Sequence, residues 1–199
     1  GVVEGHSPLK GGRITQKTEI NLTRIDIYWL YDHNIGVKIP LSSKLFNDSM
    51  YKESFDYLEY YHRKGNGIIV ATDELAECIK NDFPNYKIEA SCIQDITDNE
   101  HYEKKVALGL YDTIVLPIHS NDDIKFIESI KRKDLLRLFM NVECSYNCPS
   151  KVCYNTTSKF NRDTAAGTET KMQCSFYDLG LERTLIYQCM RKWVYLILN

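Results

Sequence analysis

The chain has 199 residues, 43% of them hydrophobic, and a formal net charge of -2 at pH 7. This length and composition suit a globular domain with a sizeable core and exclude a largely disordered chain. The near-neutral charge gives no strong signal for nucleic-acid binding, and the absence of a run of about 18 apolar residues excludes an ordinary membrane span.

The first residues, GVVEGHSPLKGGR, contain no initiator methionine and lack the basic-then-apolar order of a signal peptide. We therefore expect a cytoplasmic protein whose sequence begins inside a longer reading frame. The seven cysteines are an odd number, and without an export signal they argue against a complete disulfide framework.

Short apolar runs alternate with amphipathic segments from about residue 20 onward. Helical periodicity over 20–33 predicts that Trp29 lies in the core. Thr72 and Asp73 can cap the helix that follows them, and Ser120 with Asp123 has the spacing of a capping box. The expected elements, in chain order, are a helix at 20–33, a strand at 37–41, a helix at 49–63, a strand at 68–71, a helix at 74–82, a strand at 86–91, a helix at 98–108, a strand at 113–118, a helix at 121–130 and a strand at 135–142.

Alternating strands and helices of this kind are typical of an α/β fold with parallel strands, because a parallel crossover must be long enough to hold a helix. The G-x-G-x-x-G fingerprint of a dinucleotide-binding sheet is missing, so we favour a (β/α) barrel over a doubly wound sheet. A whole barrel needs about 250 residues. The sequence thus predicts a partial TIM barrel of five to six strands, with residues 1–199 as one domain that forms the N-terminal portion of a larger barrel.

The cysteines gather in the C-terminal third of the chain. Cys144, Cys148 and Cys153 follow the last expected strand with the spacing C-x3-C-x4-C, and Cys174 could supply a fourth thiol within a loop over 144–175. Four thiolates can hold an iron–sulfur cluster or a tetrahedral zinc ion. The pattern matches no standard zinc or ferredoxin spacing, so reduced cysteines without a metal remain an open alternative.

Polar residues also follow the expected strands, and in a barrel the carboxyl ends of the strands form the rim that carries the active site. His119 can act there as a general base or a ligand. Asp73 and Glu143 can form a carboxylate pair, although Asp73 has a competing role as a helix cap. These three residues are the catalytic candidates, and the expected rim also includes Ser42, Ser91, Cys92, Asn141 and Cys144.

Four stretches carry a resemblance to a known family: GVKIPLSS, NGIIVATDELAECIKNDFPNYKIEAS, YDTIVLPIH and LFMNVECSYNCPSKVCY. Over residues 11–175 the chain resembles a divergent branch of the peptidase U32-like barrels. The resemblance implies a TIM-type barrel and, as in several members, a [4Fe-4S] cluster, here on Cys144, Cys148, Cys153 and Cys174. It also implies an activity: hydroxylation of RNA bases or of quinone rings, or degradation of collagen, the activity for which the family was first named.

Three hypotheses follow. The first is a barrel protein that binds an iron–sulfur cluster and modifies RNA or a small molecule. The second is a non-catalytic structural or interaction domain whose cysteines hold zinc or no metal. The third is a metal-free lyase or aldolase that uses the rim alone. The sequence leaves open whether the protein is an enzyme, which substrate it has and what its oligomeric state is.

Overall fold

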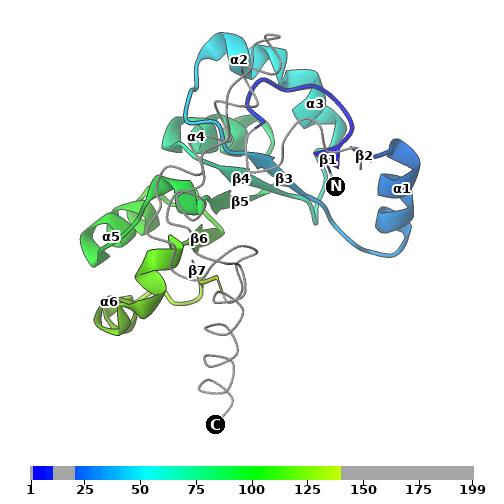
Figure 1. The fold of residues 1–199 in the computed structure, drawn as a ribbon. Helices are drawn as coiled ribbons and strands as arrows, with labels where there is room; N and C mark the ends of the chain where they lie inside the picture. The colour runs from blue at the N-terminus through cyan, green and yellow to red at the C-terminus, as the bar shows by residue number, and fades with distance from the viewer. Residues whose placement is uncertain (1, 11–20, 140–199) are drawn as a thin grey trace, which may run out of the picture. The chain divides into compact units, whose positions relative to one another are not determined.

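The protein is described by a computed structural model that covers residues 2–10 and 21–139 (Figure 1). Residues up to Leu138 belong to one structural unit. None of the helices in these two ranges has the length and the apolar character that a membrane span needs.

Five parallel strands form the central sheet. Their order in space follows the chain: β3 (Lys38–Leu41), β4 (Gly67–Val70), β5 (Lys87–Ala90), β6 (Thr113–Val115) and β7 (Leu136–Arg137). This confirms the α/β class and the parallel sheet that the alternating pattern predicts. Two strands that the pattern does not predict, β1 (Val2–Val3) and β2 (Asn21–Leu22), pair in parallel as a separate small sheet.

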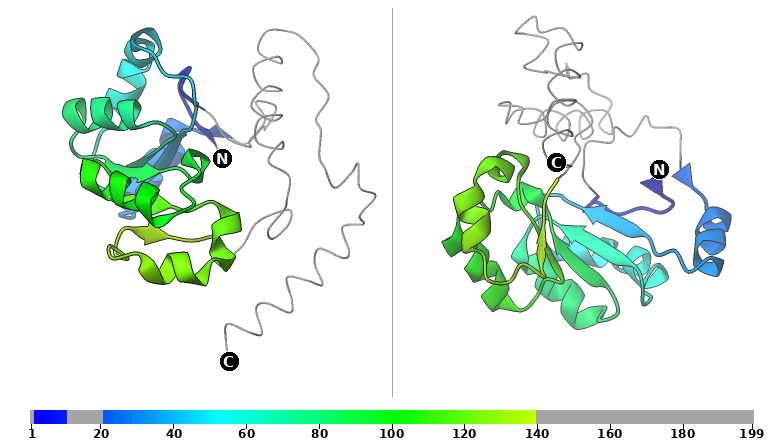
Figure 2. Two further views of the ribbon diagram at one scale, coloured as in Figure 1. Left: turned by 90° about the vertical axis from the view of Figure 1, so that its left-hand side faces the viewer. Right: turned by 90° about the horizontal axis from the view of Figure 1, so that it is seen from below.

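Helices connect the strands and lie along the outer side of the curved sheet (Figure 2). They are α2 (Asp48–Glu53), α3 (Phe55–Tyr60), α4 (Asp73–Asp82), α5 (Asn99–Leu108) and α6 (Ile124–Ser129), with two short 3-10 helices, η1 (Cys92–Gln94) and η2 (Ile118–Asp122). Helix α1 (Arg24–Asp32) precedes β3 and lies beyond the β3 end of the sheet (Figure 1). A doubly wound sheet reverses its strand order, whereas every crossover in this sheet advances in one direction. Parallel crossovers are right-handed as a rule, and when they all advance in one direction they place their helices on one face of the sheet.

The two faces of the sheet differ in composition. Buried residues alternate along the strands and face the helices, and they are Ile39, Leu41, Ile68, Val70, Ile88, Ala90 and Ile114. The opposite face carries exposed Lys38 and Lys87, and Lys38 Nζ lies 2.5 Å from Glu89 Oε2. Because the side-chain period of a strand is two, this alternation fixes which face forms the core.

Pro40 lies in the first strand of this sheet, at a position that suits its missing N–H. Gly67 N donates to Val37 O, so the backbone groups of alternate residues, Ile39 among them, point toward β4. The backbone of Pro40 therefore faces away from β4, where no ladder hydrogen bond is lost. Pro40 thus marks β3 as an edge of this sheet.

The prediction that Trp29 belongs to the core is wrong. Trp29 is 57% exposed, and the buried residue of α1 is Ile27. Leu30 and Tyr31 pack against the core beside it. The outward side of α1 is as apolar as its inward side, so periodicity alone gave no way to choose between them.

Two other local predictions need correction. The expected helix at 49–63 is two helices, because the Ser54 hydroxyl donates to Met50 O at 2.7 Å where α2 ends. The expected capping box of Ser120 does not form. Asp123 caps α6 itself by accepting from Phe126 N at 3.0 Å, and Ser120 is buried within η2.

Asp98 makes the stability of α5 depend on pH. Its carboxylate accepts from His101 N at 2.9 Å, and this hydrogen bond is the main reason that the pKa of Asp98 lies below its usual value. A carboxyl group whose pKa is lower in the folded state stabilises the fold above its unfolded pKa of about 3.9. That stabilisation is lost as the pH falls through the folded pKa.

We expect Asp98→Asn, which keeps a capping oxygen but removes the charge, to be less stable than the wild type at pH 7. The difference in unfolding free energy should shrink as the pH falls below about 4. Urea unfolding followed by circular dichroism at a series of pH values measures it. A difference that stays constant over this series would show that the charge of Asp98 has no part in the stability of α5.

Candidate functional site at the carboxyl edge of the sheet

Three connections meet at the carboxyl edge of the sheet because neighbouring parallel strands end there. Thr72 and Asp73 follow β4, η1 follows β5 and η2 follows β6. Ser91 N donates to Val70 O at 2.9 Å, which extends the pairing of β4 and β5 beyond the strands. The predicted rim residues Ser42 and Ser91 are buried, at 3% and 5% exposure.

His119 and Asp95 approach each other at this edge. His119 Nε2 lies 3.5 Å from Asp95 Oδ1, and both side chains are partly exposed to solvent. Asp95 ends η1 in the left-handed region, with φ of 55°, and its N–H donates to Cys92 O at 3.1 Å. Imidazole and carboxylate groups both serve as general acids and bases in catalysis. Sequence reasoning identified His119 and missed Asp95.

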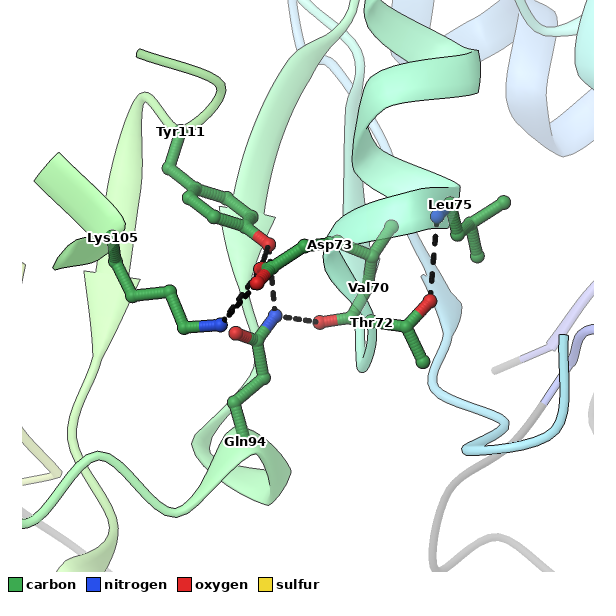
Figure 3. Close-up of polar contacts among 7 residues, drawn as sticks. All are labelled: Val70, Thr72, Asp73, Leu75, Gln94, Lys105 and Tyr111. Atoms are coloured by element: carbon green, nitrogen blue, oxygen red, sulfur yellow. Dashed lines mark hydrogen bonds and ion pairs between the residues drawn. The ribbon is translucent and has the colours of Figure 1, made fainter. Parts of the chain in front are cut away.

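Asp73 belongs to a cluster that joins three connections (Figure 3). Lys105 Nζ donates to both of its carboxylate oxygens, at 2.7 Å and 2.6 Å. The Tyr111 hydroxyl donates to the Oδ1 atom of Asp73. Burial, followed by this hydrogen bond, raises the pKa of Tyr111 well above its ordinary value, so the phenol stays neutral at physiological pH.

Gln94 connects this cluster to the η1 turn that carries Asp95. Its Nε2 atom donates to Val70 O at 3.2 Å and to the Tyr111 hydroxyl at 3.1 Å. The carbonyl acceptor of Val70 fixes the orientation of the amide, because a flipped Gln94 would place two oxygens against each other. Gln94 Oε1 is buried and accepts no hydrogen bond from the described residues.

These contacts give Asp73 a structural role. The cap of α4 is Thr72, whose Oγ1 accepts from Leu75 N at 3.3 Å, so the predicted capping role of Asp73 is wrong. The Asp73 carboxylate instead receives three hydrogen bonds from Lys105 and Tyr111, which hold α4, α5 and the start of β6 together. A carboxylate that is engaged in this way is a poor general base.

We expect Lys105→Met to lower the free energy of unfolding by about 1–3 kcal/mol, since it removes one partner of a partly buried ion pair. Tyr111→Phe should cost about 1 kcal/mol for one lost hydrogen bond. Because both groups bind Asp73, the double variant should lose less than the sum of the two single variants. Urea unfolding of the four proteins measures this coupling, and strict additivity would contradict a shared cluster.

The remaining predicted site residues, Glu143, Cys144, Cys148, Cys153 and Cys174, lie outside the described residues, as does Asn141. Within residues 2–10 and 21–139, no group of three or more His, Cys, Asp or Glu side chains is arranged to hold a metal ion. The two cysteines in these ranges, Cys78 and Cys92, are partly buried and form no disulfide. Burial, together with nearby carboxylates, raises the pKa of Cys78.

Comparisons with protein-family models, with curated proteins and with solved structures found no match to this chain.

Proposed function

We propose that the chain is a barrel-type metal protein, similar to the peptidase U32-like barrels, that holds a [4Fe-4S] cluster on Cys144, Cys148, Cys153 and Cys174. The cluster would serve a cytosolic protein that modifies RNA or a small molecule at the carboxyl edge of the sheet.

One observation supports this proposal above the others: the strand that precedes the cysteines belongs to the parallel sheet. β7 pairs in parallel with β6, and the chain then runs through Leu138 and Phe139 toward Cys144. The carboxyl ends of parallel strands share one edge, and in α/β folds that edge is where ligands bind. In the sequence, the cysteine segment follows β7.

The chemistry of the donor set favours a metal with a preference for sulfur. Three thiols within ten residues, with a fourth at Cys174, give the four thiolates that a [4Fe-4S] cluster or a tetrahedral zinc ion takes. A bound [4Fe-4S] cluster would supply electron transfer. Zinc in the same ligands would point instead to a structural or interaction domain.

His119 and Asp95 would give this edge a proton-transfer group. Asp95 is held by the hydrogen bond of its N–H to Cys92 O, and its carboxylate faces His119 Nε2 at 3.5 Å. Both side chains are exposed enough to meet a ligand in solution.

The test is anaerobic purification of the full chain, followed by elemental analysis and visible absorption spectroscopy. We expect about four iron atoms per chain and a brown preparation, as a cluster of this type requires. Cys144→Ser, Cys148→Ser and Cys153→Ser should each lose most of the iron. Cys78→Ser is the matched control, because Cys78 lies in α4, outside the cysteine segment, and it should keep the full iron content.

The other outcomes separate the alternatives. One zinc ion per chain, lost in the same three variants, would replace the cluster with a zinc-binding structural domain. A colourless protein with neither metal would reject both metal hypotheses. Iron that survives all three cysteine substitutions would show that these thiols do not hold it.

A further inference from the structure

The outward side of α1 is an exposed aromatic surface. Ile25, Tyr28 and Trp29 on α1 are 80%, 58% and 57% exposed, and Tyr60 at the end of α3 is 43% exposed. Tyr60 and Tyr28 meet at their hydroxyl groups, 3.4 Å apart. We call these four residues the α1 patch. Helix α1 lies beyond the β3 end of the sheet, away from α4, α5 and α6 (Figure 1 and the right view of Figure 2).

The patch has the composition of a protein-binding centre. Trp, Tyr and Arg are the residues enriched where most binding energy is concentrated, and scattered single apolar residues are the norm elsewhere on protein surfaces. Arg24 stacks over the ring of Tyr60 at 4.6 Å, and His33 stacks on Trp29 with ring centroids 4.0 Å apart. These stacked pairs hold the aromatic rings in place before any partner arrives, which lowers the entropy cost of binding.

The charges around the patch indicate which partner it fits. Asp26 and Asp32 are exposed on the same helix, and their carboxylates disfavour a phosphate backbone or an anionic membrane as the partner. Arg24 stands near the beginning of α1 and Asp32 at its end. Neither side chain forms an ion pair within the described residues.

We propose that the α1 patch binds a second copy of this chain, with the two α1 helices antiparallel across a two-fold axis near Tyr28 and Trp29. In this arrangement Arg24 of each copy lies beside Asp32 of the other, so the two unpaired charges become two equivalent ion pairs. Ile25, Asp32, Trp29 and Tyr28 share one side of the helix at 3.6 residues per turn, which places the aromatic rings between these pairs. A two-fold contact requires a self-complementary surface of this kind.

The size of the patch predicts a weak, reversible dimer. At the exposures given above, the four side chains offer on the order of 400–500 Å² per copy, against about 800 Å² per partner in a standard interface. The patch therefore supplies the apolar centre, and the surrounding polar residues supply the rim. We expect a Kd on the order of 10 µM.

Sedimentation of the full chain up to about 200 µM tests this proposal, because that range spans the expected Kd. The wild type should change from monomer to dimer over this range. Trp29→Asp should weaken association by more than about 30-fold, the effect of losing a central aromatic residue. Ile124→Asp is the control: Ile124 is equally exposed, at 59%, but lies on α6, so it should leave the Kd within about two-fold.

Charge reversal tests the antiparallel arrangement of the two α1 helices, in which Arg24 of one copy lies beside Asp32 of the other. Arg24→Asp and Asp32→Arg should each weaken self-association, because each places like charges opposite one another. An equimolar mixture of the two variants should associate again, since both cross-pairs then join opposite charges. Trp29 should also move its fluorescence to shorter wavelength on dimerisation, which a Trp193→Phe background isolates, because the chain has two tryptophans.

Three results would overturn the proposal. The first is a wild type that stays monomeric over the whole range, which would also follow if the patch binds a different molecule. The second is a dimer that Trp29→Asp leaves intact, which would move the contact to another surface. The third is a variant mixture that associates no better than either variant alone. Circular dichroism of each variant shows whether it remains folded.

Discussion

Gly36→Ala should be the most destabilising glycine-to-alanine substitution in the described residues. A Cβ at Gly36 would lie 2.0 Å from Gly65 O and 2.7 Å from Gly65 C, closer than any real contact allows. Both are backbone atoms and cannot turn aside as a side chain does. We expect the free energy of unfolding to fall by about 3 kcal/mol or more, since overpacking costs about 1–3 kcal/mol even where side chains can relax.

The position of Gly36 explains why the substitution should also disturb the pairing of β3 with β4. Val37 follows it directly, and Val37 O accepts from Gly67 N at 2.9 Å to begin the pairing of β3 with β4. A backbone shift at Gly36 therefore disturbs the register of the first strand pair. Urea unfolding measures the loss, which is a large part of the 5–15 kcal/mol that a domain of ordinary stability has.

Gly109→Ala is the matched control for this substitution. Gly109 has a positive φ of 65°, but no atom lies within 4 Å of the place that an added methyl group would occupy. The cost there should be the conformational strain alone, about 1–2 kcal/mol. If Gly36→Ala lowered the free energy of unfolding no more than Gly109→Ala, the backbone of Gly65 could not lie as close to Gly36 as described.

Asn66→Ala should lower the free energy of unfolding by about 3–5 kcal/mol, because it leaves buried polar groups without partners. Asn66 is fully buried, and its Oδ1 accepts from Val37 N at 2.9 Å. Its Nδ2 donates to Tyr61 O at 2.8 Å and to the Tyr31 hydroxyl at 2.7 Å. One carboxamide thus joins the start of β3, the end of α3 and α1.

A graded series separates these contributions. Tyr31→Phe removes one of the three hydrogen bonds and should cost about 1 kcal/mol. Asn66→Asp keeps an acceptor for Val37 but sets a carboxylate oxygen against Tyr61 O, so it should be as harmful as Asn66→Ala. Asn85→Ala, on an exposed asparagine, should change stability by less than about 0.5 kcal/mol. Equal effects at Asn66 and Asn85 would contradict the bonding of Asn66.

The arrangement of the sheet could be predicted because hydrophobic runs mark buried parallel strands. The five expected strands, near residues 37, 68, 87, 114 and 137, lie side by side in one sheet. The sequence was a poorer guide to the exact ends of the helices and strands, and to which side of a helix faces the core. Helix α1 has apolar residues on both sides, so its periodicity could not show that Trp29 points outward.

The contacts of the site could be predicted only in part. His119 was identifiable because it follows an apolar strand, but Asp95 gives no comparable signal in the sequence. The partners of Asp73 are Lys105 and Tyr111, which lie more than thirty residues away, and nothing local marks them. Long-range pairs of this kind depend on how the connections pack, whereas capping and strand patterns depend on neighbours in the chain.

The sequential strand order has a consequence for how the sheet is assembled. Each described strand of this sheet pairs with the next strand in the chain, from β3 to β7, at separations of 20 to 29 residues. Each parallel pair must close a loop that holds a whole helix before the strand contacts form, so we expect this sheet to form more slowly than a helical bundle of the same size. Because each strand needs only the strand before it as a partner, the described sheet can be extended one β/α unit at a time in chain order.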